Sequence, residues 1–242
     1  MSIPPLTVRP IVYTDHKPEW LAIFRALGAR TLMDEDGWSE VELDRGRVAL
    51  HHLYEGKAEG DVDLGFETAD LEAYAAGVLP MEGMTVARAT ADHGETIRVV
   101  GRDGLAFLID ERPPGEPLPP APTTSVCALW ISTDVGATAQ DLETLGLRKR
   151  LTNVNGRSIN VSAAEGEVLV HTNDGGPIGA TVAVDTTDLD ACHKALIDAG
   201  IAHDVIDETH GRTLKVPFPG KPDAQLWVAQ EDDDPVGVIR HF

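Results

Sequence analysis

The chain has 242 residues, of which 42% are hydrophobic and 5% aromatic, and its 40 acidic and 20 basic residues give a formal net charge of −20. That charge argues against a nucleic acid partner, because the phosphates would be repelled. No run approaches the roughly 18 apolar residues that cross a bilayer, so we expect no membrane partner. The two cysteines cannot form a disulfide framework, and the first five residues lack the pattern of a signal peptide. We therefore expect a cytoplasmic protein.

The first part of the chain reads as a strand, a helix and three further strands. Turn signals at Asp36-Gly37 and Arg45-Gly46 separate the last three strands. The helix has apolar residues at spacings of three and four. The expected elements are a strand over Val8–Thr14, a helix over Pro18–Leu27 and strands over Arg30–Asp34, Ser39–Leu43 and Arg47–His52.

The same order of elements then begins again. The expected elements are a strand over Val62–Glu67, a helix over Asp70–Val78 and strands over Thr85–Ala89, Thr96–Val100 and Ala106–Asp110. A proline-rich segment, residues 113–125, follows and predicts an extended, semi-rigid linker.

The region after the linker repeats the region before it. Thr68–Ala73 corresponds to Thr187–Ala191, and His93–Val99 corresponds to His210–Val216, 117 residues later. A repeat of this length indicates a duplicated domain rather than a solenoid. Helices are expected near Thr138–Leu145 and Leu189–Ala199.

The sequence therefore predicts an α+β fold of four βαβββ units. These units form two tandem domains, residues 1–112 and 126–242, and the second ends in an acidic tail. Each domain would curl a mixed sheet into a concave face that a ligand can fill.

This pattern resembles the vicinal-oxygen-chelate superfamily, which includes glyoxalase I, extradiol dioxygenases, fosfomycin-resistance enzymes and bleomycin-resistance proteins. The resemblance rests on Asp63–Ala73, on its counterpart Thr181–Ala191 and on the turn Arg102-Asp103-Gly104. It implies tandem domains that pair within a monomer as a pseudo-dimer, or a homodimer.

Enzymes of this superfamily usually hold one divalent metal with His, Gln and Glu side chains from the first and last strands of paired units. The resemblance places those positions at Arg9, Asp63, Cys127 and Thr181 on first strands and at Ala49, Leu108, Leu169 and Val228 on last strands. Leu, Val and Ala offer no lone pair to a metal. We therefore expect no cofactor. The alternative is one divalent metal ion bound by relocated ligands, His51 or His171 with Asp63 or Glu67.

Four histidines are candidate ligand-binding residues. His51 and His171 end equivalent strands, two residues beyond the expected acid position, which places them on the same sheet face. They would contact a ligand, or else be strand-end side chains in water. His93 and His210 each precede a glycine and would gate a cavity, or else cap a turn.

Two tryptophans and one acid complete the candidate binding set. Trp38 and Trp130 stand out because aromatic residues are scarce, and either could form a flat wall against a planar ligand. Asp63 occupies a first-strand position. No residue is assigned a catalytic role.

Two functions remain open, and a third possibility is that only one of the two repeated domains has a functional site. The first is binding and sequestration of a small molecule, such as a cationic antibiotic or metabolite, as in bleomycin resistance; the negative charge would attract such a ligand. The second is a metal-dependent glyoxalase-like lyase or extradiol-type dioxygenase with non-standard ligands. In either case, one copy could serve only as a scaffold.

Overall fold

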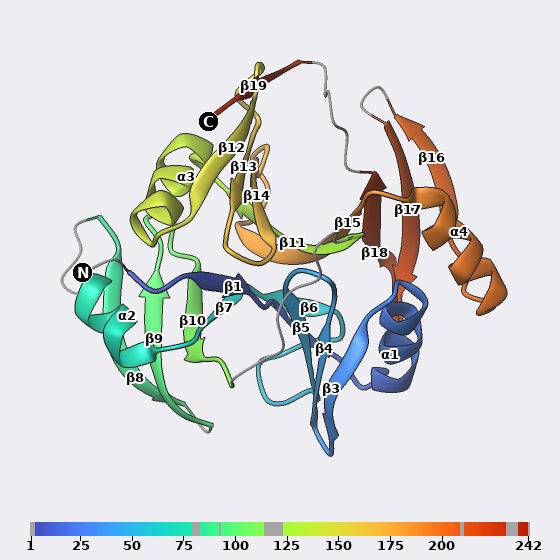
Figure 1. Cartoon of the computed structure of the whole chain (residues 1–242), viewed down its shortest axis with the longest axis horizontal. Coiled ribbons are helices and arrows are strands. Elements are labelled where there is room, and N and C mark those ends of the chain that lie inside the picture. Colours follow the sequence, from blue (N-terminus) through green and yellow to red (C-terminus); the bar gives the residue numbers. More distant parts are fainter. Residues whose placement is uncertain are drawn as a thin grey trace.

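The computed structural model describes residues 3–78, 83–91, 93–113, 123–208, 211–230 and 237–241. It confirms a mixed α+β protein in which strands predominate and short helices pack on the outside (Figure 1). Within the described residues, no helix is long and apolar enough to span a membrane. Most of the proline-rich segment, residues 114–122, and the acidic stretch 231–236 lie outside the described residues.

The first half of the structure, up to residue 113, has short strands and two helices. The helices are α1 (Lys17–Ala26) and α2 (Leu71–Val78). The strands are β1 (Leu6–Val8), β2 (Ile11–Tyr13), β3 (Arg30–Glu35), β4 (Trp38–Glu42), β5 (Arg47–His51), β6 (Asp61–Asp63), β7 (Gly65–Thr68), β8 (Thr85–Ala91), β9 (Gly94–Val100) and β10 (Ala106–Glu111).

The second half, from residue 123, has longer strands. Its helices are α3 (Val135–Thr144) and α4 (Leu189–Asp198). Its strands are β11 (Thr124–Ser132), β12 (Arg148–Asn153), β13 (Ser158–Ser162), β14 (Glu167–Thr172), β15 (Gly179–Thr186), β16 (Asp204–Glu208), β17 (Gly211–Phe218), β18 (Lys221–Gln230) and β19 (Val238–Arg240).

The two halves differ in how their sheets are joined. In the second half one continuous sheet has the order β16-β17-β18-β15-β11-β14-β13-β12-β19. In the first half the strands form two five-stranded sheets, β1-β7-β10-β9-β8 and β3-β4-β5-β2-β6. The expected strand over Val8–Thr14 is interrupted at Pro10, which has no N–H to donate to a sheet. The expected strand over Val62–Glu67 is likewise interrupted at Leu64.

Aspartates cap three of the four helices in the same way. Asp70, Asp134 and Asp188 each accept a hydrogen bond from the backbone N–H three residues later, at 2.8 to 3.0 Å. This is the usual contribution of an N-cap side chain. Helix α1 instead has Pro18 in its first turn.

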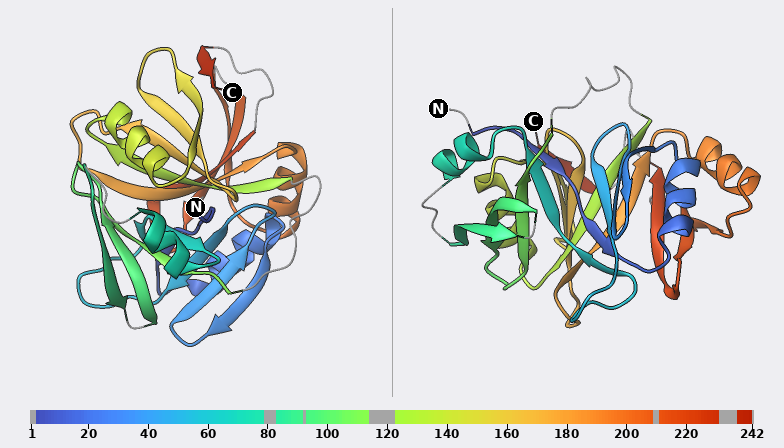
Figure 2. Two further views of the ribbon diagram at one scale, coloured as in Figure 1. Left: turned by 60° about the vertical axis from the view of Figure 1, so that its left-hand side comes forward. Right: turned by 90° about the horizontal axis from the view of Figure 1, so that it is seen from below.

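Each half places a turn against the first strand of the other half. The Arg45 N–H donates to the Thr124 carbonyl at 3.2 Å, and the Val126 N–H donates to the Arg45 carbonyl at 2.8 Å. Reciprocally, the Val8 N–H donates to the Glu165 carbonyl at 2.9 Å. Figure 2 shows the two halves in contact along this central region. The division into two tandem domains stays a prediction.

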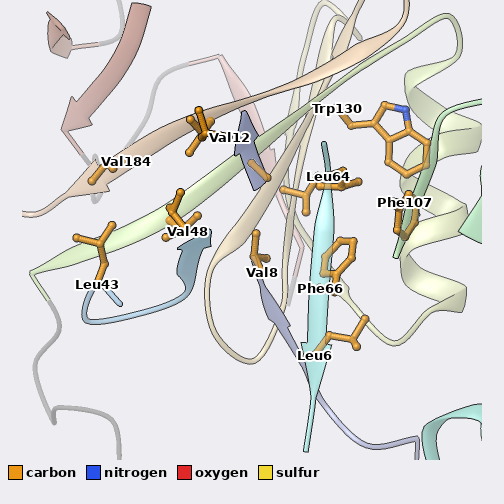
Figure 3. Packing of buried hydrophobic residues seen from close by; sticks show 14 of the residues in the cluster. Leu6, Val8, Val12, Leu43, Val48, Leu64, Phe66, Phe107, Trp130 and Val184 are labelled. Atoms are coloured by element: carbon orange, nitrogen blue, oxygen red, sulfur yellow. The ribbon is translucent and has the colours of Figure 1, made fainter. Parts of the chain in front are cut away.

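The hydrophobic core runs from one half into the other without a break. Trp130 of β11 is fully buried and packs edge-on against Phe107 of β10, with ring centres 5.5 Å apart (Figure 3). Its indole N–H donates to Asp103 at 2.8 Å. Trp130 is therefore a core residue at the junction of the halves, and the structure does not place it as a wall for a ligand.

Candidate functional site

Four aromatic side chains meet at one end of the β3-β4-β5-β2-β6 sheet. They are Tyr13, Trp38, His51 and Tyr54, called the aromatic cluster below. Tyr13, Trp38 and His51 are paired with one another across β2, β5 and β4, so they share one face of the sheet. The opposite face carries buried residues such as Val12 and Val41 of the core.

The rings of the aromatic cluster are in contact through their edges. The His51 ring centre lies 5.5 Å from those of Tyr13 and Tyr54 and 5.6 Å from that of Trp38. Tyr13 is buried, Trp38 and His51 are partly buried, and Tyr54 is 48% exposed. The aromatic cluster is therefore buried at Tyr13 and open to solvent at Tyr54.

A charged pair borders the aromatic cluster. The Tyr13 hydroxyl donates to Asp63 at 2.9 Å, and the Lys57 ammonium lies 2.6 Å from Asp63 Oδ2. The same ammonium lies 4.2 Å from the centre of the Tyr13 ring. Burial, followed by the negative charge of Asp63, raises the pKa of Tyr13. Tyr13 thus remains a neutral hydrogen-bond donor.

The hydrogen bond of His51 defines the chemistry of its other nitrogen. Nδ1 lies 2.6 Å from the carbonyl oxygen of His52, and it must carry the proton in order to donate to that oxygen. In the neutral ring Nε2 is then an acceptor. His51 can therefore accept a hydrogen bond, or a proton, from a hydroxyl group of a ligand.

A network of buried charges continues along the same sheet face. Arg9, between β1 and β2, lies 3.1 Å from Glu67 and pairs with Asp110. Arg47 of β5 contacts Glu67 at 3.3 Å and both Glu40 and Glu42 at 3.0 Å. All of these side chains are nearly inaccessible to solvent.

The charge network also joins the two halves. Arg112 lies 2.5 Å from Glu165, on the turn of the second half that contacts β1, and 3.2 Å from Glu42. Arg30 also pairs with Glu42. The network includes the carboxylates of Glu40, Glu42, Glu67, Asp110 and Glu165 and the guanidinium groups of Arg9, Arg30, Arg47 and Arg112.

Glu67 is the member of this network with the most altered acidity. Burial, with a smaller contribution from the negative charge of Glu40, raises the pKa of Glu67 to about 7, while Arg9, Arg47 and Arg112 act in the opposite direction. Glu67 is thus a group that can exchange a proton near neutral pH.

Two of the remaining candidate histidines, His93 and His171, lie apart from the aromatic cluster. His93 is exposed and has Nε2 3.1 Å from Asp110, so it contacts the edge of the charge network. His171 repeats the hydrogen bond of His51, with Nδ1 2.8 Å from the Thr172 carbonyl. Its neighbours on the paired strands are Ser158 and Ile131 rather than aromatic rings. His210 lies outside the described residues.

The described residues do not fit a three-ligand metal centre. Among them, no group of three or more His, Cys, Asp or Glu side chains is arranged to hold a metal ion. Val228, an expected last-strand position, is buried in the core, and its neighbour Trp227 is exposed instead. In the first half, Arg9 and Lys57 already pair with Asp110 and Asp63.

No family model and no curated protein matches the chain. Its fold is similar to that of solved extradiol dioxygenases, which belong to the vicinal-oxygen-chelate superfamily. A variant of homoprotocatechuate 2,3-dioxygenase from B. fuscum has a TM-score of 0.64 and 13% identity, over 97% of this chain and 74% of that one. The native enzyme from Arthrobacter globiformis gives the same score and identity, over 97% and 82%. A catechol 2,3-dioxygenase has a TM-score of 0.60 and 15% identity, over 96% and 94%.

These similarities correct our expectation about cofactors. Reactions with O₂ are carried by a metal or an organic cofactor, and the solved structures named above are dioxygenases. These similar structures contradict the expectation that the protein has no cofactor, and the alternative of one divalent metal ion fits them. Because the described donors do not form a three-ligand set, we assign no residue to that ion and no step to it.

The sequence identified part of this site and missed the rest. The structure brings together Trp38, His51 and Asp63, which had been selected separately. Tyr13 was missed. It lies two residues after Ile11 on one strand, and this spacing places the two side chains on the same face of the sheet. Tyr54 follows β5 in a loop, and no periodic signal could have placed it.

Proposed function

We propose that the protein binds a small planar molecule with a hydroxyl group, such as a phenol or catechol, at the aromatic cluster. The observation that carries the proposal is the contact of His51 with Trp38, Tyr13 and Tyr54. Aromatic faces favour a flat ring, and Nε2 of His51 can accept the ligand's hydroxyl proton. The solved structures of similar fold, which include catechol and homoprotocatechuate dioxygenases, support this ligand class.

The proposal can be tested by measuring the binding of a panel of catechols with titration calorimetry and tryptophan fluorescence. We expect saturable binding and quenching of Trp38; in Trp38→Ala the quenching is expected to be lost and the binding to be weakened. Cyclohexanediols of the same size provide the control for ring planarity. Equal binding of the planar and saturated compounds would refute the proposal.

A second candidate is a metal-dependent lyase or dioxygenase that uses one divalent ion. Its support is the similarity to solved dioxygenases. The test is elemental analysis of the full chain, followed by oxygen uptake with catechols after addition of Fe(II), Mn, Ni or Zn. Stoichiometric metal with oxygen uptake would support this function, and their absence after loading would remove it. Sequestration of a cationic antibiotic stays a prediction, which the similar structures favour less.

A further inference from the structure

A groove lies between the end of α1 and the side of α4, and no residue of the aromatic cluster is among those that line it. The two helices lie side by side on the outside of the molecule (Figure 1). The volume of the groove is about 230 Å³, and its lining includes Leu27, Gly28, Thr186, Asp188, Cys192 and Ala195.

The corresponding place between α2 and α3 is filled by two side chains. The Tyr74 hydroxyl of α2 donates to the Leu145 carbonyl at the end of α3, at 2.8 Å. Ile3 lies beside it, with Cγ1 3.0 Å from the point where a Cβ on Gly77 would stand. Its Cγ2 lies 3.8 Å from the equivalent point on Gly146. Tyr74 is completely buried.

The ends of α1 and α3 correspond residue by residue. Leu27 and Leu145 are the C-cap residues, and the glycines that follow them, Gly28 and Gly146, have φ of +90° and +100°. Each pair is 118 residues apart. The Leu27 carbonyl thus holds the place of the carbonyl that receives the Tyr74 hydroxyl.

The sides of α2 and α4 correspond equally well, but their side chains differ in size. Tyr74 is the fourth residue after the capping Asp70, and Cys192 is the fourth after the capping Asp188. Gly77 has its counterpart in Ala195, at the same interval of 118. A thiol therefore stands in the groove where the other half has a phenol ring.

We propose that the groove between α1 and α4 is a binding site for a small phenol that takes the place of the missing tyrosine ring. Its ring would lie beside Cys192 and Ala195, and its hydroxyl would donate to the Leu27 carbonyl, as Tyr74 does to Leu145. The space is adequate, because a cavity of about 150 Å³ can hold benzene. A phenol has a pKa of about 10 and keeps its proton at neutral pH.

The thiol of Cys192 suits a neutral aromatic neighbour. It donates a hydrogen bond to Thr186 Oγ1 at 3.5 Å, and burial raises its pKa. The sulfur therefore stays in the thiol form, which makes favourable contacts with ring edges. The site depends on the shape of the groove and is independent of the function proposed for the aromatic cluster.

This site can be tested by measuring the binding of 4-methylphenol to the full chain with calorimetry and with ligand-observed NMR. We expect saturable binding, and roughly fivefold weaker binding of toluene, because toluene lacks the hydroxyl that makes a hydrogen bond of about 1 kcal/mol. Cys192→Tyr restores the side chain of the other half and should abolish binding to the groove, leaving only binding at the aromatic cluster. If Cys192→Tyr does not fold, Ala195→Leu fills the same space from the neighbouring turn of α4.

Two controls separate this site from the aromatic cluster. Trp38→Ala should leave binding of 4-methylphenol to the groove unchanged, and a crystal soaked in 4-bromophenol should show the bromine between α1 and α4. Absence of saturable binding to the folded wild-type chain would overturn the proposal. An unchanged number of binding sites for 4-methylphenol in the filled variants would also overturn it.

Discussion

The guanidinium carbon of Arg9 lies 5.4 Å from the centre of the Trp38 ring. Arg9 is also paired with Glu67 and Asp110 in the interior. One side chain therefore joins the charge network to the aromatic cluster. A ligand that contacts Trp38 would sense the charge state of the network, since a cation near a ring face alters its electrostatic potential.

Replacement of Trp38 tests the ligand site directly. We expect Trp38→Ala to weaken catechol binding by roughly two- to tenfold, which corresponds to the 0.5–1.5 kcal/mol of an aromatic contact. The matched control is Trp227→Ala, because Trp227 is 43% exposed on the second half. Calorimetric titration should show unchanged affinity in the control. Equal losses in the two variants would refute the assignment of the site to the first half.

The raised pKa of Glu67 predicts that the stability of the folded protein depends on pH in a specific way. The pKa of Glu67 in the folded state is raised to about 7 from the ordinary value of 4.5. The folded state thus binds more protons than the unfolded chain between these values, so this contribution is complete below pH 4.5 and is lost as the pH rises through 7. Its size is on the order of 3 kcal/mol.

The variant Glu67→Gln removes that contribution. We expect the free energy of unfolding of the wild type to fall relative to that of Glu67→Gln as the pH is raised from 5 to 8. Urea titrations of both proteins across this range measure the difference in slope. Parallel pH profiles would show that Glu67 titrates normally in the folded protein.

Replacement of Arg9 tests how much the buried ion pairs contribute to the free energy of unfolding. Arg9→Met removes one guanidinium from the buried Glu67 and Asp110, which keep their contacts with Arg47 and His93, and removal of one member of a buried pair costs about 3–5 kcal/mol. The control is Arg212→Met, whose ion pair with Asp190 at 2.9 Å is exposed on both sides. Exposed pairs contribute about 0–1 kcal/mol. Urea denaturation should separate the variants, and similar losses would contradict a structural role for Arg9.

The sequence predicted the order of helices and strands well because local signals encode it. Helix starts are marked by capping aspartates such as Asp70 and Asp188, and helix ends by glycines such as Gly28. Strand faces follow the alternation of residues, which placed His51 on the face of the expected acid position, whereas Trp38, its partner on β4, stood out because aromatic residues are scarce. The sequence did not predict the strand breaks at Pro10 and Leu64, which divide the sheet of the first half.

The contacts that define the sites depend on chain segments far apart in sequence. Trp130 follows the same alternating pattern as Trp38, but the position of Phe107 makes it a core residue. The charge network requires Glu165 to reach Arg112 across the two halves. No periodicity in the sequence reports such a contact, because it depends on how the halves pack.

The packing of the halves gives the last prediction. Gly166 has φ of +81°, and a Cβ there would lie 2.9 Å from Val8 Cβ and 3.0 Å from the Val126 carbonyl oxygen. Gly166→Ala therefore adds a steric conflict between the halves to the cost of a left-handed backbone. In Gly156→Ala, where φ is +72° and no atom lies within 4 Å of the Cβ position, only the backbone cost of roughly 1–2 kcal/mol applies. We expect Gly166→Ala to lower the free energy of unfolding by about 1–3 kcal/mol more than Gly156→Ala, since overpacking has costs of this size. Urea denaturation measures both, and equal losses would show that the turn at Gly166 does not pack against the first half as described.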